Sequence, residues 1–173
     1  DLDEELRQVF PEFRGCPIDG GKDTAPVRCL HCSTFNVPSE PRGKARPVVT
    51  RFNTYTPDPA NWVQDLKFLA SNAVNSSGWQ MTDEEQPVVL KLQITRKLPA
   101  NLSKKKRAAM WGLPAPKIPD VVNIVAAVCD ALEGIVYRND RQVFQIEAVK
   151  RWGDEHMTGI SIKTCTDKTH DLH

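Results

Sequence analysis

The segment from Lys117 to Gln142, KIPDVVNIVAAVCDALEGIVYRNDRQ, constrains the fold more than any other part of this sequence. Pro119 and Asp120 are typical of a helix start, because proline is tolerated in the first turn and aspartate can accept the free backbone N–H groups there. Gly134 is typical of a helix end. Apolar residues between them recur at helical spacing, namely Val121, Ile124, Val125, Val128 and Leu132. The sequence therefore predicts a buried helix with Asp120 at its mouth.

After this helix the chain is expected to turn back. Residues 135–137 are predicted to be a short extended run, residues 138–140 a turn, and residues 142–149 an alternating strand. Asp140 falls in the turn, so the fold can bring a second carboxylate beside the helix. Taken alone, each acid has an ordinary structural role: Asp120 as a helix cap, Asp130 within the helix and Asp140 as a turn residue.

The remaining elements mix helices and strands. Strands are predicted at residues 35–37, 47–52, 86–95 and 159–163, helices at residues 57–75 and 103–111, a short helix within residues 1–10, and loop over residues 15–34. No strict strand–helix–strand repeat is present, so the expected fold class is α/β (α+β), with one small mixed sheet packed against helices. The expected organisation is an N-terminal arm at residues 1–34, a domain at residues 35–163 and a C-terminal tail at residues 164–173.

Basic residues are clustered, although the formal net charge is only +1. Neither residues 42–56 nor residues 87–118 include an Asp or Glu. Such segments can neutralise phosphates locally, but they are also consistent with a solvated charged surface. A basic first turn in the 103–111 helix opposes the helix dipole, which favours a role in ligand binding. The candidate DNA-binding residues are Arg42, Lys44, Arg46, Arg51, Lys104, Lys105, Lys106, Arg107 and Lys117.

Cys29 and Cys32 have the C-x-x-C spacing with which two thiolates can bind one zinc ion. Cys16 could supply a third ligand. A fourth could come from Cys165, His31, His170 or His173. A metal would order a loop-rich arm that has little apolar content, whereas the alternative is a set of ordinary buried thiols. Five cysteines, an acidic start and the lack of a long apolar run lead us to expect an intracellular protein.

The order Pro-Asp-x-x-Asn, Asp-Ala-Leu-x-Gly and an acidic turn followed by Gln-Val resembles the RusA family of Holliday-junction resolvases, in its phage-type form. The basic segments near Lys44 and after Leu98-Pro99 fit the same resemblance, which covers about residues 35–163 and not the cysteine-containing arm. The resemblance implies an Mg²⁺-dependent endodeoxyribonuclease of phage origin. Such an enzyme acts as a two-fold homodimer on branched DNA during recombination and repair, in the cytoplasm of the host or bacterial cell.

The metal site implied by this resemblance is incomplete in this sequence. Asp120 and Asp140 would be the catalytic, Mg²⁺-binding acids, but the family's second acid falls on Val122 and its helix lysine on Ala126. Because valine cannot coordinate a metal, we expect a DNA-binding protein with reduced or lost cleavage. Two alternatives stay open. One is an active endonuclease in which Asn123 or Glu147 supplies the missing ligand, and the other is a protein-interaction module that uses the arm to contact a partner.

Overall fold

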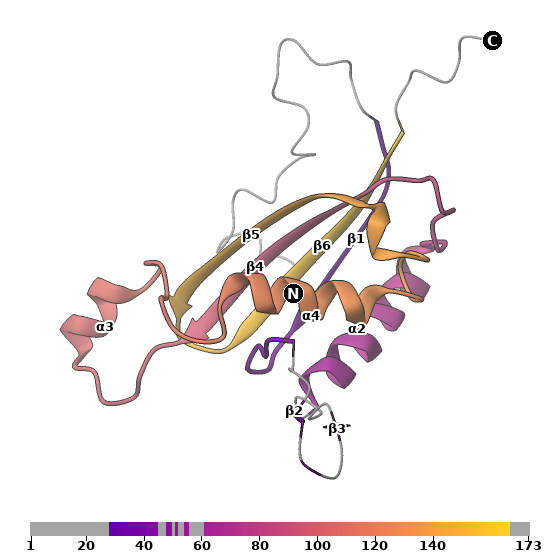
Figure 1. Ribbon diagram of the computed structural model, residues 1–173. Helices are drawn as coiled ribbons and strands as arrows, with labels where there is room; N and C mark the ends of the chain where they lie inside the picture. The colour runs from indigo at the N-terminus through magenta and orange to yellow at the C-terminus, as the bar shows by residue number, and fades with distance from the viewer. Residues whose placement is uncertain (1–27, 45–47, 50, 52–53, 56–60, 167–173) are drawn as a thin grey trace.

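A four-stranded mixed sheet forms the centre of the computed structural model, which describes residues 28–44, 48–49, 51, 54–55 and 61–166. The strand order is β1-β6-β4-β5, where the strands are β1 (Arg28–Val37), β6 (Met157–Thr166), β4 (Val88–Lys97) and β5 (Val143–Gly153). β6 pairs antiparallel with both β1 and β4, whereas β4 and β5 are parallel. A separate pair, β2 (Val48–Val49) and β3 (Thr54–Tyr55), lies away from this sheet (Figure 1). The expected mixed sheet with helices is confirmed.

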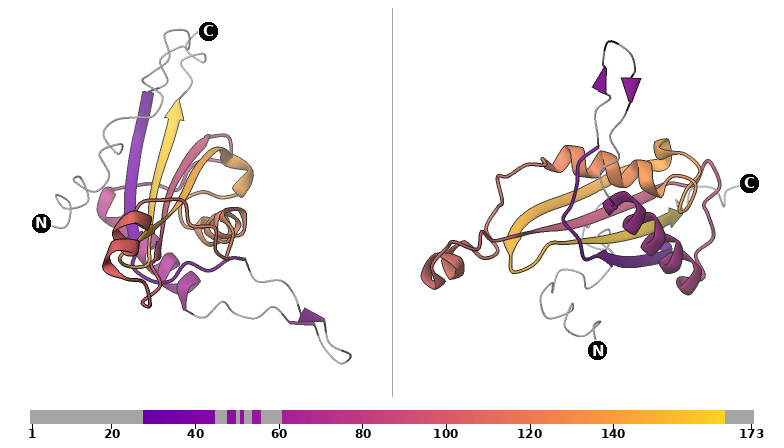
Figure 2. Two further views of the ribbon diagram at one scale, coloured as in Figure 1. Left: turned by 90° about the vertical axis from the view of Figure 1, so that its left-hand side faces the viewer. Right: turned by 90° about the horizontal axis from the view of Figure 1, so that it is seen from below.

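Two helices cover one face of the sheet. α2 (Trp62–Ser77) lies along β1, and α4 (Val121–Leu132) lies between α2 and β5 (Figures 1 and 2). The connection from β4 through α4 to β5 is the crossover that parallel strands require. A third helix, α3 (Lys104–Met110), stands beyond the end of the sheet and contributes no buried residue. No helix among the described residues is long and apolar enough to cross a membrane.

The main core lies between the sheet and the helices α2 and α4. Alternate residues of β4, which are Val88, Leu90, Leu92 and Ile94, are fully or almost fully buried in it. Ile124 and Val128 of α4 face them with no exposed surface. This is the helical face that the apolar spacing predicted, and truncating one of its large members to alanine would cost about 2–5 kcal/mol.

β1 is longer than the sequence predicted. The loop expected over residues 28–34 is wrong, because these residues form the first part of β1 and pair with β6. β6 likewise continues to Thr166, beyond the predicted end at residue 163. The pairing itself supplies the backbone hydrogen bonds, so tertiary context overrides the weak local strand signal. The predicted boundary between residues 34 and 35 therefore lies inside a strand.

The extended run predicted for residues 135–137 is also wrong. The N–H groups of Ile135 and Val136 both donate to the carbonyl oxygen of Leu132, at 3.1 and 2.9 Å, and continue the helix end into a turn. Val136 and Tyr137 have no exposed surface, so their hydrophobicity reflects core packing. The short helix within residues 1–10 lies outside the described residues, as do residues 56–60 at the start of the predicted 57–75 helix.

Candidate nucleic-acid interface and metal site

Asp120 is at the N-cap position of α4, as predicted. Its backbone is extended, with φ −71° and ψ 161°, and its carbonyl oxygen accepts from the N–H of Ile124 at 3.2 Å. The predicted side-chain cap is not formed, because the carboxylate accepts no hydrogen bond from the first turn. The exposed carboxylate of Asp120 therefore adds a negative charge near the start of α4, but it does not cap the helix by a hydrogen bond.

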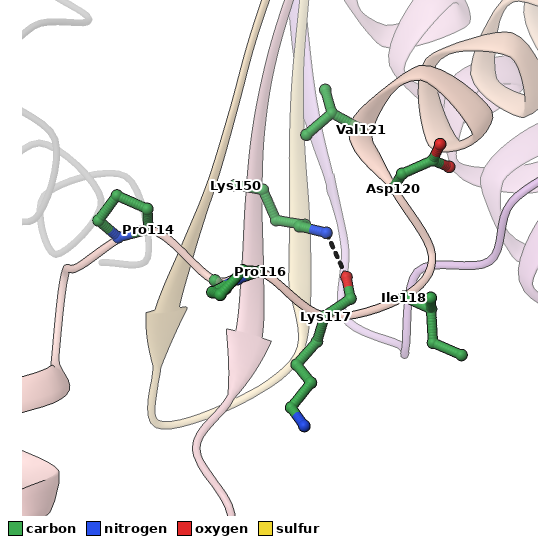
Figure 3. A pocket seen from close by; sticks show the side chains of 8 residues that line it. Pro114, Pro116, Lys117, Ile118, Asp120, Val121 and Lys150 are labelled. Atoms are coloured by element: carbon green, nitrogen blue, oxygen red, sulfur yellow. Dashed lines mark hydrogen bonds between the residues drawn. The ribbon is translucent and has the colours of Figure 1, made fainter.

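Lys150 of β5 binds the backbone just before this helix. Its Nζ donates to the carbonyl oxygen of Pro119 at 2.7 Å and also to that of Lys117 (Figure 3). Partial burial lowers the pKa of Lys150, the charge of Arg96 acts in the same direction, and Asp120 opposes both. Sequence reasoning missed Lys150. The available signal was a lysine two residues beyond Ala148, on the helix-facing side of the strand.

A cavity of about 440 Å³ lies between Lys150, the start of α4 and the proline-rich connector that precedes it. Figure 3 shows the Lys150 ammonium directed at the connector, with Asp120 at the other side of the cavity. Asp140 is not among its lining residues, which are Pro114, Ala115, Pro116, Lys117, Ile118, Asp120, Val121 and Lys150.

The turn that carries Asp140 is a short 3-10 helix, η2 (Asp140–Gln142), organised by Gln142. The Oε1 of Gln142 accepts from the N–H groups of Arg138 and Asn139, at 2.9 and 3.1 Å. Its Nε2 donates to Thr82 Oγ1 at 2.9 Å and to the carbonyl oxygens of Asp83 and Gln86 at 2.6 and 3.1 Å. Gln142 is only 5% exposed, so this one side chain fixes the acidic turn against the segment before β4.

Tyr137, which precedes this turn, contacts the second half of α4. The hydroxyl of Tyr137 donates to the carbonyl oxygen of Cys129 at 2.9 Å. The charge of Asp140 raises the pKa of Cys129, after the larger effect of burial. Cys129 is nine residues beyond Asp120, a rise of roughly 13 Å along a helix. Asp120 and Asp140 therefore have different immediate neighbours.

Lys44 links the basic N-terminal segment to this part of α4. Its Nζ lies 2.7 Å from Asp130 Oδ2, and its backbone N–H donates to the carbonyl oxygen of Asn123 at 3.0 Å. Asp130 raises the pKa of Lys44 most, and Asp140 adds a smaller effect. Gly43 permits the close approach, because a methyl group there would lie 2.9 Å from Asn123 Cβ.

The residues present do not fit a three-carboxylate Mg²⁺ site. Within the described ranges, no three side chains of His, Cys, Asp or Glu gather where they could hold a metal ion. Val122 is 74% exposed on the first turn of α4, and Ala126 lies one turn further on the same helix. Glu147 pairs with Lys91 at 3.1 Å on the face of the sheet opposite α4, so it is badly placed to replace the missing acid.

Most of the candidate DNA-binding residues are at the surface. Lys104, Lys105 and Lys106 are exposed on α3, whose N-cap Ser103 accepts from the N–H of Lys106 at 3.4 Å, as predicted. Arg107 pairs with Asp154 at 3.5 Å, and Arg42 with Glu40 at 3.2 Å. Lys117 and Arg51 are exposed, and Arg46 lies outside the described residues.

The backbone register brings one arm cysteine opposite a tail cysteine. Cys29 of β1 and Cys165 of β6 are directly paired, and Cys32 is paired with Lys163. Cys16, His170 and His173 lie outside the described residues. The predicted zinc site therefore stays a prediction.

Comparison with known proteins assigns this chain to a family that is named for a DNA-cleaving enzyme. The profile of the endodeoxyribonuclease RusA family matches residues 38–163, so the chain belongs to that family. The uncharacterized protein YqaN of Bacillus subtilis (strain 168) is 30% identical over 140 residues, which cover 78% of this chain and 97% of YqaN. A solved structure of cyanuric acid hydrolase is 13% identical, with 83% of this chain and 40% of that chain covered. The TM-score between the two structures is 0.28.

Proposed function

We propose that this chain binds branched DNA, including Holliday junctions, and that its Mg²⁺-dependent cleavage is reduced or lost. Membership of the RusA family supports junction recognition. The exposed cluster of Lys104, Lys105 and Lys106 supports contact with phosphates, since each neutralised phosphate releases bound counterions.

The observation that carries the proposed loss of cleavage is the side chain of Val122. It is 74% exposed at the start of α4, where the family's second acid is expected, and it has no atom that can bind a metal. Two acids, Asp120 and Asp140, remain, with different neighbours along α4. A divalent ion held there would lack the ligand that fixes its geometry.

A two-fold homodimer is part of this proposal. β5 is at an edge of the sheet, and it exposes two apolar side chains, Phe144 at 57% and Ile146 at 43%. Exposed apolar residues on an edge strand favour self-association. Light scattering should report a dimer, and Phe144→Ser should weaken it, whereas an unchanged dimer would place the interface elsewhere.

We also propose that residues 1–34, the last seven of which begin β1, bind zinc and offer a surface for a protein partner, and that a RusA domain and a short tail follow them. The pairing of Cys29 with Cys165 supports a site between arm and tail. Metal analysis of the purified protein should give close to one zinc per chain, falling in Cys29→Ser. Less than about half an equivalent would count against the site.

Gel shifts at rising salt test DNA binding. The chain should bind a synthetic four-way junction more tightly than duplex of the same length. Replacing Lys104, Lys105 and Lys106 by alanine should lower the slope of log affinity against log salt by about three, because each phosphate contact contributes about 0.9. No shift at low salt would favour the protein-interaction module instead.

A further inference from the structure

Trp111 differs from the other tryptophans of this chain. Trp62, Trp79 and Trp152 are 2%, 5% and 7% exposed, whereas Trp111 is 51% exposed. It immediately follows α3, in what we call the basic arm, residues 98–115. Figure 1 shows that α3 projects beyond the ends of β4 and β5, and the second view in Figure 2 agrees. A large aromatic side chain thus lies on a projecting and strongly basic surface.

The base of the basic arm is held by its own small core. Leu98, Ala115 and Trp152 are buried together, and Leu102 and Met110 pack against them. The backbone of the arm also pairs with the end of β5: Gly112 N–H donates to Trp152 O at 2.9 Å, and Trp152 N–H donates to Leu113 O at 2.9 Å. Trp111 is not part of this small core, so burial in the described fold does not explain it.

The indole ring is nevertheless held in place. Its Nε1 donates to Asp154 Oδ2 at 3.1 Å, and Asp154 Oδ1 lies 3.5 Å from Arg107 Nη2. Gly112 follows with φ +77°, a backbone conformation that few other residues adopt readily. The polar edge of the ring is therefore satisfied within the protein, while half of its surface stays exposed. A fixed and exposed aromatic surface loses little entropy on binding.

The charges around Trp111 indicate what the ring contacts. Lys104, Arg107 and Trp111 are at positions i, i+3 and i+7, which fall on one helical face. Asp154 offsets the charge of Arg107, but residues 87–118 include no acid and the three lysines of α3 are exposed, so the basic arm favours an anionic partner. Cationic side chains beside an exposed aromatic ring are the combination with which proteins bind unpaired bases and their phosphates.

We infer that Trp111 stacks on an exposed base of branched DNA while the lysines of α3 contact the neighbouring phosphates. This inference rests on the proposed function and adds a specific contact to it. A closed duplex offers few exposed base faces, whereas the branch point of a junction offers bases that are more easily unstacked. Trp111 therefore contributes to the preference for branched over fully paired DNA, and the lysines contribute to both.

The test uses the full chain, a four-way junction with hairpin-capped arms, and a hairpin-capped duplex of equal length. Trp111→Ala should weaken junction binding by about 5- to 150-fold, the range for loss of one stacked base, and should weaken duplex binding less. The salt slope should stay unchanged. The control is Leu113→Ala, which removes a similarly exposed apolar side chain from the same arm and should leave the junction preference intact.

Tryptophan fluorescence gives a second readout that does not depend on the alanine variant folding. Because the other three tryptophans are buried, junction binding should quench the emission of the wild type, and Trp111→Phe should abolish this quenching while largely keeping the affinity.

Three outcomes would overturn the inference. They are an equal loss of junction and duplex binding in Trp111→Ala, unchanged quenching in Trp111→Phe, and a loss of dimer mass in Trp111→Ala. If the wild type binds no DNA at low salt, the proposed function fails as well. If the wild type binds the junction with normal salt dependence and the Trp111 variants bind it equally well, only the stacking inference is rejected.

Discussion

The Nζ of Lys150 lies 2.7 Å from the carbonyl oxygen of Pro119, so the end of β5 holds the backbone just before α4. The same ammonium group also donates to the carbonyl oxygen of Lys117. Asp120 follows Pro119 directly, and its position depends on how this connector is held. A residue of the sheet thereby positions the acid at the helix start.

Lys150→Met should destabilise the fold by about 1–3 kcal/mol, because it leaves the two carbonyl oxygens without their charged donor while keeping most of the apolar stem. Urea denaturation monitored by tryptophan fluorescence measures the effect. Arg151→Met is the matched control, since its side chain is exposed on the same strand and should change stability by less than about 0.5 kcal/mol. Equal losses in the two variants would contradict the role of Lys150.

Gln142→Leu should be more severe. It removes the acceptor for two backbone N–H groups, those of Arg138 and Asn139, and the donor to three oxygens, all around a side chain that is 5% exposed. Each buried group left unsatisfied costs about 1–3 kcal/mol, so a loss of about 3 kcal/mol or more is expected. Gln145→Leu, at an exposed position of β5, should be nearly neutral. A mild effect of Gln142→Leu would show that the turn has other supports.

Asp130→Asn should strengthen DNA binding. The carboxylate of Asp130 lies 2.7 Å from Lys44 Nζ and competes with phosphates for that cation. Removing its charge releases Lys44 and lowers repulsion of DNA, so the affinity measured by gel shift should rise a few-fold and the salt slope should steepen. Glu85→Gln makes the same charge change at another exposed position and should have less effect. Weaker binding in Asp130→Asn would mean that Lys44 needs its partner.

The stability of the protein should fall as the pH is lowered, partly because of His156. Burial and the charge of Arg96 lower the pKa of His156 from its ordinary value of 6.5, and its Nδ1 accepts a hydrogen bond from Lys97 N–H at 3.2 Å, which requires the neutral ring. Below pH 6.5 the unfolded chain therefore binds a proton that the folded chain resists, and this contribution is lost as the pH falls towards the folded pKa. Urea denaturation at pH 7 and at about pH 5 measures the effect: the free energy of unfolding should fall less between the two pH values in His156→Gln than in the wild type. An equal loss would assign the pH dependence to other groups.

The periodic parts of the sequence predicted the fold well. β4 and α4 were placed to within a few residues, because both have an unbroken apolar face that the core requires. The first part of β1 was missed, since its strand character comes from pairing with β6 and is weak in its own sequence. Ile135 and Val136 were misassigned because a short apolar run does not distinguish a strand from a buried turn.

Of the candidate site, the sequence predicted only the acidic residues and the clusters of basic residues. Asp120 and Asp140 were found because helix starts and turns have recognisable local patterns. Lys150 contacts the carbonyl oxygen of Pro119, 31 positions away, and no local pattern reports that contact. Gln142 forms a local capping box with Asn139, which the sequence pattern could have indicated, but its contact with Thr82, 60 positions away, has no local signal. Trp111 was visible as a residue type, but only its 51% exposure distinguishes it from the three core tryptophans.

Cleavage of a synthetic four-way junction in Mg²⁺ or Mn²⁺ tests the central claim most directly. Val122 and Ala126 are four residues apart on α4 and so share a face, at the positions where the family resemblance implies an acid and a lysine. The wild type should bind the junction with little cleavage, and Val122→Asp combined with Ala126→Lys should raise the cleavage rate on the order of 100-fold, the scale of one restored electrostatic contact to the transition state. Efficient nicking by the wild type that disappears in Asp120→Asn would contradict this account, because the acids already present would then be sufficient.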